Sequence, residues 1–199
     1  MEFVYEVENS LSKELCEELI EKFRKDDKKS TSCVGGGKID PSIRKSKVLN
    51  LSIYEDWKDI DVILESKLKE GISKYKKYLD NLIPKDISNN IFNSLIDEGY
   101  TIQSMSQNDF YTWHIDQFVT RMGGEYSTRE QRRVITCIWY LNTLEENKDG
   151  GSTDFWNTYK IQPKQGSLLF FPSTWTYIHR GSPVKSSNTK YTCITWLGY

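Results

Sequence analysis

The sequence predicts a mixed α+β fold that is mainly β, with a strand-rich core and helices packed on its outside. Apolar residues recur at helical spacing only in the first hundred residues. From about residue 100, short runs rich in β-branched and aromatic residues are separated by Gly, Asn, Asp and Pro. No long linker divides the chain, so we expect one domain over 1–199, with 1–100 as helical and irregular support and 101–199 as the β core.

Two helices are expected in the supporting region. Ser12 can cap the first, and Pro84 ends the second or lies just beyond it. Between them, residues 46–53 alternate enough to form a strand, and three glycines at 35–37 predict a flexible loop, because the GxxxxGK[ST] pattern of a phosphate-binding loop is absent. The apolar positions of the two helices are Leu15, Cys16, Leu19, Ile20 and Phe23, and then Ile60, Ile63, Leu64, Leu68, Ile72, Tyr75 and Leu79.

The second half carries the expected strands. Residues 134–141, 167–171 and 191–197 are rich in Ile, Val, Thr, Phe, Trp and Tyr, which is typical of an all-β sandwich or barrel. Residues 113–116 form a further candidate strand.

Composition excludes several classes of protein. The 199 residues include 27 basic and 28 acidic side chains, a net charge of -1, which gives no reason to expect nucleic acid or an anionic membrane as partner. No apolar run approaches the roughly 18 residues of a membrane span, and the acidic N-terminus lacks the features of a signal peptide. The four cysteines have no CxxC spacing, so we expect reduced thiols and a cytoplasmic protein.

Both histidines of the chain lie in the β half, and one belongs to a His-x-Asp tripeptide. In a strand, His114 and Asp116 point to the same face and can converge on one metal ion. His179 follows 65 residues later, where a barrel wall can return to the same point. Two imidazoles and one carboxylate form the facial triad that binds non-haem Fe(II) and leaves positions open for O2 and a co-substrate. A chance tripeptide and a structural histidine are the alternatives.

A lysine and a tyrosine lie on strands that can face this site. By parity Lys190 shares a face with Thr192, Ile194 and Trp196, and a lysine inside an apolar barrel is costly unless an anion pairs with it. Lys190 could instead reach solvent from the strand end. Tyr140 could offer its hydroxyl to a bound carboxylate, or could be a core residue with another partner.

Residues 102–196 resemble the prolyl 4-hydroxylase-like branch of the Fe(II)- and 2-oxoglutarate-dependent oxygenases. The order and approximate spacing of seven motifs match, across about half of the chain. The motifs are His114-Ile115-Asp116, Tyr140-Leu141-Asn142, Gly150-Gly151 with Phe155, Leu168-Leu169-Phe170-Phe171-Pro172, His179, Pro183-Val184 and Lys190-Tyr191. Outside this segment, the helix near residues 11–19 and residues 43–46 resemble the family more loosely.

The resemblance implies a double-stranded β-helix, that is, a cupin-like jelly-roll core. It implies that His114, Asp116 and His179 bind Fe(II), and that Lys190 and Tyr140 contact 2-oxoglutarate, with ascorbate as a reductant. The loop before Lys190 is one residue longer than is usual in the family, which leaves Lys185 as an alternative anchor.

The implied activity is hydroxylation of a prolyl residue in a peptide or protein. The same chemistry on a free amino acid, another side chain or a nucleobase is the first alternative, and a jelly-roll binding protein without activity is the second. We expect residues 117–132 to form a long loop at the mouth of the site. Five arginines near the mouth hint at an acidic or phosphate-bearing substrate, although nearby acidic residues dilute the hint; they are Arg121, Arg129, Arg132, Arg133 and Arg180.

Overall fold

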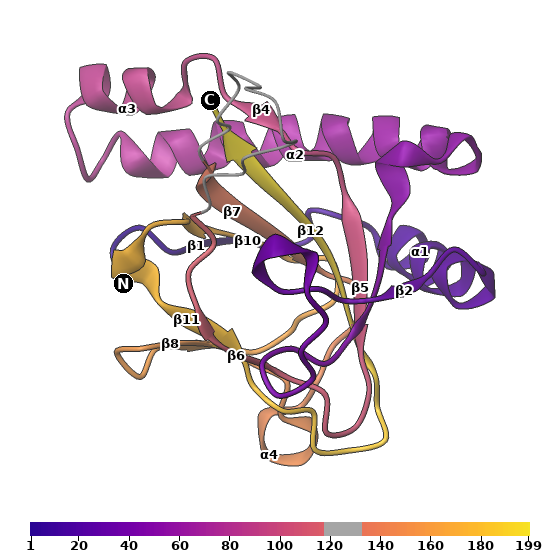
Figure 1. The fold of residues 1–199 in the computed structure, drawn as a ribbon. Helices are drawn as coiled ribbons and strands as arrows, with labels where there is room; N and C mark the ends of the chain where they lie inside the picture. Colours follow the sequence, from indigo (N-terminus) through magenta and orange to yellow (C-terminus); the bar gives the residue numbers. More distant parts are fainter. Residues whose placement is uncertain (118–132) are drawn as a thin grey trace.

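The computed structural model describes residues 1–117 and 133–199, and two antiparallel sheets face each other in it (Figure 1). The larger sheet has the order β1-β10-β7-β12-β5-β3-β2, with β4 paired to β12, and the smaller has the order β6-β11-β8-β9. The larger sheet comprises β1 (Tyr5–Val7), β2 (Ser30–Thr31), β3 (Lys47–Asn50), β4 (Ile96–Asp97), β5 (Thr101–Met105), β7 (Arg133–Tyr140), β10 (Leu168–Pro172) and β12 (Lys190–Gly198). The smaller sheet comprises β6 (Tyr111–His114), β8 (Thr153–Phe155), β9 (Lys160–Ile161) and β11 (His179–Gly181).

Helices cover the larger sheet on the face that points away from the smaller one (Figure 1). They are α1 (Lys13–Lys25), α2 (Lys58–Leu79) and α3 (Lys85–Phe92), and a short α4 (Glu146–Asp149) lies beyond the smaller sheet. Single turns of 3-10 helix occur at η1 (Gly35–Gly37), η2 (Leu51–Ile53), η3 (Glu55–Trp57) and η4 (Trp175–Tyr177). The predicted jelly-roll core with supporting helices is therefore confirmed.

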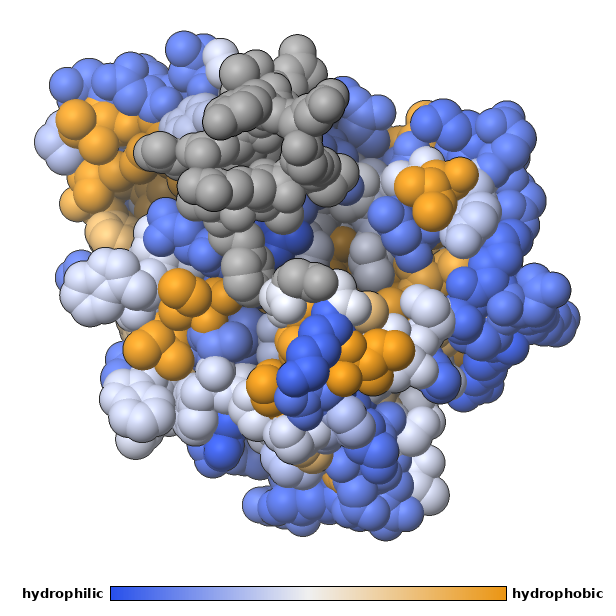
Figure 2. All heavy atoms as spheres, viewed as in Figure 1, coloured by the Kyte–Doolittle hydropathy of each residue, from blue (hydrophilic) through white to orange (hydrophobic). Residues whose placement is uncertain are grey.

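Helix α1 forms as its sequence predicts. The Ser12 hydroxyl accepts a hydrogen bond from the Leu15 amide (3.2 Å) and so caps the first turn. The apolar positions 16, 19, 20 and 23 are buried, while the opposite face is charged and gives the hydrophilic surface at the right of Figure 2.

Strand β7 separates the hydrophobic core under the helices from the space between the two sheets. Ile135, Cys137 and Trp139 point to the helices and join the main hydrophobic cluster, because side chains alternate along a strand. Ile138 and Tyr140 point the other way and join a smaller cluster between the sheets. The interior is thus lined by alternate residues of the same strands whose other faces hold the helices in place.

The N-terminal half contributes more to the sheets than its sequence predicts. Strands β1 to β4 all lie within residues 1–100, and β1 pairs with β10 in the larger sheet. Strands of two to four residues are too short to give a clear period, and their backbone partners lie far along the chain. Residues 51–53 form η2 rather than the end of a strand, and α3, which begins after Pro84, was not expected.

The expected single domain over 1–199 stays a prediction, although the main hydrophobic cluster contains residues of α1, α2 and the larger sheet. Among the residues that the structure describes, no helix is long and apolar enough to cross a membrane.

Close packing of α2 on the sheet depends on Gly71. A Cβ at this position would lie 2.6 Å from Leu168 Cδ2 and 3.0 Å from Phe170 Cζ, both on β10. We expect Gly71→Val to lower the free energy of unfolding by about 2 kcal/mol, because overpacking outweighs the gain in helix propensity. Urea denaturation measures this change. The control is Ser66→Val on the exposed face of α2, which should change stability by less than about 0.5 kcal/mol. Equal effects of the two substitutions would contradict the packing.

Candidate metal centre and its cavity

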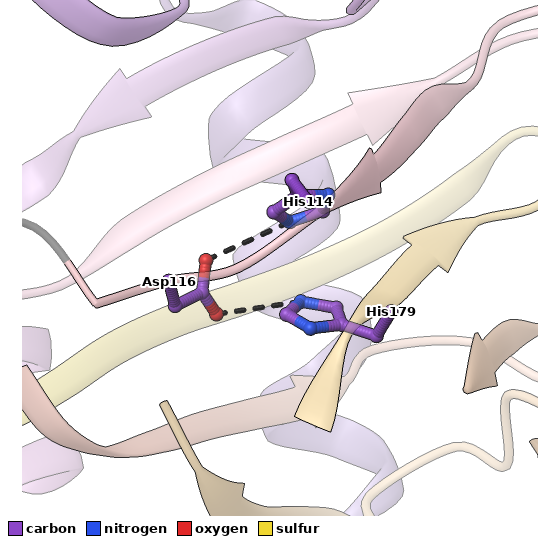
Figure 3. Close-up of side chains that lie close together, drawn as sticks. All are labelled: His114, Asp116 and His179. Atoms are coloured by element: carbon purple, nitrogen blue, oxygen red, sulfur yellow. Dashed lines mark ion pairs between the residues drawn. The ribbon is translucent and has the colours of Figure 1, made fainter. Parts of the chain in front are cut away.

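His114, Asp116 and His179 come together between the two sheets. His114 ends β6, His179 begins β11, and the antiparallel register makes their Cα atoms direct partners. Asp116 lies two residues beyond His114, just after the strand ends. One Asp116 oxygen is 3.6 Å from His114 Nε2 and the other is 3.4 Å from His179 Nε2 (Figure 3). The ligand atoms of all three residues lie within 4.8 Å of one another.

Both imidazoles are oriented by backbone carbonyls. His114 Nδ1 lies 2.7 Å from the Thr112 carbonyl oxygen, and His179 Nδ1 lies 3.0 Å from the Tyr177 carbonyl oxygen. A carbonyl only accepts hydrogen bonds, so each Nδ1 carries the proton and each Nε2 presents a lone pair to the centre. Burial, reinforced by the neighbouring His179, lowers the pKa of His114 to about 4, so this ring is neutral at pH 7.

Asp116 is ionised and held in place. Burial opposes its charge, but the adjacent His179 and His114 outweigh burial and hold the pKa of the carboxyl well below its usual range. The Thr136 hydroxyl donates to Asp116 Oδ2 (2.8 Å) and also lies 2.9 Å from Ser173 Oγ. Thr136 is on the inward face of β7, so the sheet itself fixes the carboxylate.

This donor set fits a divalent first-row metal. Two imidazole nitrogens and one carboxylate, all on one side of a common point, form the 2-His-1-carboxylate arrangement that suits non-haem Fe(II). The hydrogen bonds to both Nδ1 atoms and to the carboxylate are the outer contacts that such ligands usually have.

A cavity of about 430 Å³ opens beside the three residues, within the usual size range of small-molecule sites. Residues of both sheets and of the segment before β3 line it. The polar and charged lining residues are Arg44, Gln103, Tyr111, His114, Asp116, Arg133, Thr153, His179, Arg180, Lys190 and Thr192.

Lys190 lines the cavity, as the parity of β12 predicts. Thr192, Ile194 and Trp196 of the same face line it too. The Lys190 side chain is buried, and Nζ lies 5.5 Å from the centre of the Tyr140 ring, with no ion pair to any described residue. Burial lowers the pKa of Lys190 to about 8, with Asp154 acting in the opposite direction. The alternative anchor, Lys185, is exposed and does not line the cavity.

Tyr140 lies behind the cavity wall. Its ring is fully buried, and its hydroxyl is 2.7 Å from Thr153 Oγ1. Thr153 lines the cavity whereas Tyr140 does not. Contact of Tyr140 with a bound carboxylate therefore stays a prediction, and Thr153 is the hydroxyl that the structure exposes there.

The cavity residues that the sequence did not assign to the site include Thr153, Arg44, Gln103 and Tyr111. The Tyr111 ring stacks on His114 with 3.5 Å between ring centres. Tyr111 lies three residues before His114 in the same strand, which is the one signal that could have pointed to it. Arg44 and Gln103 lie far from the histidines in sequence and carry no such signal.

Two of the five arginines noted in the sequence are paired with carboxylates. Arg133 contacts Glu98 (2.6 Å) and Arg180 contacts Asp154 (2.9 Å), so neither is a strong sign of an acidic substrate. Arg121, Arg129, Arg132 and most of the expected loop at 117–132 lie outside the described residues.

Comparison with known families matches residues 100–198, about half of the chain, to the 2OG-Fe(II) oxygenase superfamily. The chain belongs to this superfamily. It is accordingly a 2-oxoglutarate-dependent dioxygenase with Fe(II) as its metal. No curated protein matches the sequence.

Solved structures share the fold of this oxygenase at 16–18% sequence identity. A prolyl hydroxylase from Trichoplax adhaerens, in complex with a peptide fragment of the hypoxia inducible factor oxygen degradation domain, has a TM-score of 0.73, 17% identity, and coverage of 100% of this chain and 84% of its own. The viral collagen prolyl hydroxylase of Paramecium Bursaria Chlorella virus-1 has a TM-score of 0.65, 18% identity, and coverage of 98% and 95%. A Pseudomonas putida prolyl-4-hydroxylase has a TM-score of 0.63, 16% identity, and coverage of 98% and 92%.

Thr136 offers a test of how the oxygenase holds its carboxylate. We expect Thr136→Val to weaken binding of a divalent metal by about 10- to 100-fold, because Asp116 Oδ2 loses its hydroxyl donor. Titration calorimetry with Mn(II) measures this affinity. Thr136→Ser keeps the hydroxyl and should bind like the wild type. Unchanged affinity in the valine variant would rule out this role for Thr136.

Proposed function

We propose that this oxygenase hydroxylates a prolyl residue in a peptide or protein, with His114, Asp116 and His179 as its iron ligands. The observation that supports this most strongly is that these three side chains converge beside a cavity that contains a buried lysine. Both histidines of the chain belong to this group. Three metal-binding side chains lie on one wall of the cavity, and the cation of Lys190 lies on another. This arrangement suits a co-substrate with two carboxylates, one of which binds at the metal while the other pairs with the lysine.

In the proposed mechanism the protein binds and orients its two reactants. Fe(II) supplies activation of O2, coupled to oxidation of 2-oxoglutarate to succinate and CO2. The ammonium group of Lys190 pairs with the far carboxylate of 2-oxoglutarate, and the Thr153 hydroxyl is placed to donate to the same group. Tyr140 then acts as a positioning residue through Thr153. Ile138 and Ile194 supply apolar walls that exclude water from the bound co-substrate. We further propose ascorbate as a reductant.

The prolyl substrate is supported by the three structural neighbours, all of which are prolyl hydroxylases, one of them bound to a peptide fragment. A free amino acid, another side chain or a nucleobase would be a different substrate for the same chemistry. A cytoplasmic location is part of the proposal, because all four cysteines are free thiols, three of them buried.

Turnover of 2-oxoglutarate tests the proposal. Protein is incubated under air with Fe(II), ascorbate and 2-oxoglutarate, and succinate is followed by NMR with and without a pool of proline-containing peptides. We expect succinate to rise with peptide, together with a gain of one oxygen atom on proline, and His114→Ala to reduce both to background. Succinate formation retained in that variant would contradict the iron site. Succinate that does not respond to the peptides would contradict the prolyl substrate alone.

The anchoring role of Lys190 predicts a pH dependence. Since the pKa of Lys190 in the free protein is about 8, the charged form dominates at pH 7 and is lost as the pH rises through that value. We expect the dissociation constant for 2-oxoglutarate to increase about tenfold between pH 7 and pH 9, because binding must then recover a proton. Titration calorimetry on the Mn(II)-loaded protein measures it.

Two variants control this prediction. Lys190→Arg stays charged across the range and should lose the pH dependence. Lys185→Met removes the exposed lysine nearby and should keep it. The same dissociation constant at both pH values in the wild type would contradict the assignment of Lys190.

A further inference from the structure

The cations that line the cavity differ in whether a carboxylate of the chain neutralises them. Arg133 pairs with Glu98 and Arg180 with Asp154. Lys190 is assigned to the co-substrate in the proposed function. Arg44 is the remaining lining cation, and no acidic side chain of the described residues lies within ion-pair distance of its guanidinium.

The guanidinium of Arg44 has more donors than partners. One terminal nitrogen donates to the Cys33 carbonyl and the other to Gln103 Oε1, each over 3.3 Å, which is long for a hydrogen bond. The Nε–H is buried and has no hydrogen-bond partner among the residues that the structure describes. A guanidinium carries five N–H donors, so an arginine with a purely structural role would be expected to use more of them.

The surroundings of Arg44 favour the binding of an anion to its guanidinium. The guanidinium packs on the Tyr111 ring, 4.8 Å from its centre, and burial lowers the pKa of Arg44. A buried charge without a counter-ion is costly, and a carboxylate that supplies two oxygens removes that cost. Arg44 therefore favours a carboxylate over a neutral amide of the same shape.

The position of Arg44 relates such an anion to the metal centre. Arg44 and Tyr111 form an isolated antiparallel β-bridge, and the Tyr111 ring stacks on the His114 ring. Arg44 also contributes to the electrostatic field at His114 and itself feels the charge of Asp116, whereas Lys190 lies against Tyr140 and is influenced by Asp154. Lys190 and Arg44, neither of which forms an ion pair with a described residue, thus lie in different parts of one cavity, and Arg44 is the one beside the metal-binding residues.

We propose that Arg44 binds a carboxylate of the substrate, and that the substrate therefore carries an acidic group close to the carbon that is oxidised. For a prolyl substrate, this group is an aspartate or glutamate next to the target proline, or a chain-terminal carboxylate at the proline. The inference rests on the proposed function for the identity of the reaction, but not for the existence of the anion site.

Binding to the Mn(II)-loaded protein with saturating 2-oxoglutarate, without O2, tests this inference. Two peptide pools are compared, identical except that one has Asp or Glu beside a central proline and a free C-terminus, and the other has Asn or Gln and an amidated C-terminus. A second pair of pools replaces the proline with alanine. Paramagnetic broadening of the peptide NMR signals by Mn(II) reports binding close to the metal, independently of turnover.

We expect the wild type to bind the acidic pool about 10- to 100-fold more tightly than the amide pool, the range for a charge-assisted hydrogen-bonded pair. Arg44→Gln should bring the ratio close to one, and Arg44→Lys should restore part of it. Lys45→Gln is the matched control, since it removes the adjacent positive charge from a side chain that does not line the cavity, and it should keep the wild-type ratio.

Several outcomes would overturn the inference. They are equal binding of the two pools by the wild type, no binding of either pool, or an equal loss for both pools in Arg44→Gln. A weakening of 2-oxoglutarate binding in Arg44→Gln as large as in Lys190→Met would assign Arg44 to the co-substrate instead. Selective binding of the acidic pools with no hydroxylation of proline would support the anion site and contradict the prolyl substrate, so the two failures are distinct.

Discussion

The centre of this molecule depends on one register, that of β6 against β11. His114 and His179 are 65 residues apart in sequence but are direct Cα partners across this strand pair. A shift of the pairing by one residue would turn one imidazole to the other face of the sheet and replace it with Trp113 or Arg180. The pairing of β11 with β8 on its other side, where Phe155 is the partner of His179, restrains β11 against such a slip.

The larger sheet supplies the other half of the site by the same alternation. The outward residues of β7 and β12, such as Trp139 and Cys193, are buried against the helices and fix the strands. The inward side chains are then not required for packing against the helices. Thr136 can hold Asp116, and Lys190 is buried with no ion pair to an acidic side chain in the described part of the chain. The free energy gained by burying apolar side chains on one face of the sheet therefore offsets the free energy lost by burying polar and charged groups on the other.

Sequence patterns predicted the parts of the fold that have a clear period. The Ser12 cap, the apolar stripes of α1 and α2, and the inward parity of β12 were all readable, because each depends on neighbours a few residues away. Strands β1, β2 and β4 were missed because their stability comes from partners far along the chain, as in the pairing of Tyr5 with Phe170. The alternation of residues 46–53 predicted a strand to residue 53, but the structure has a 3-10 turn at residues 51–53, and the strand ends before it.

The same distinction holds for the site. The two histidines and the nearby aspartate could be grouped from the sequence because histidine is so rare in this chain and the family resemblance ordered the motifs. Arg44 could not, since its approach to Tyr111 depends on a single backbone bridge between β6 and the segment before β3. Nor could the sequence tell that the Tyr140 hydroxyl would form a hydrogen bond with the Thr153 hydroxyl, because that contact joins strands of different sheets.

We propose that one cavity holds a metal ion at His114, Asp116 and His179, and 2-oxoglutarate between that metal and Lys190. A crystal structure of the protein grown without O2, with Fe(II) and 2-oxoglutarate, tests it most directly. We expect an anomalous signal for an iron ion bonded to His114 Nε2, His179 Nε2 and one oxygen of Asp116, with the far carboxylate of 2-oxoglutarate against Lys190 Nζ. Iron bound elsewhere, or 2-oxoglutarate oriented with no contact to Lys190, would contradict it.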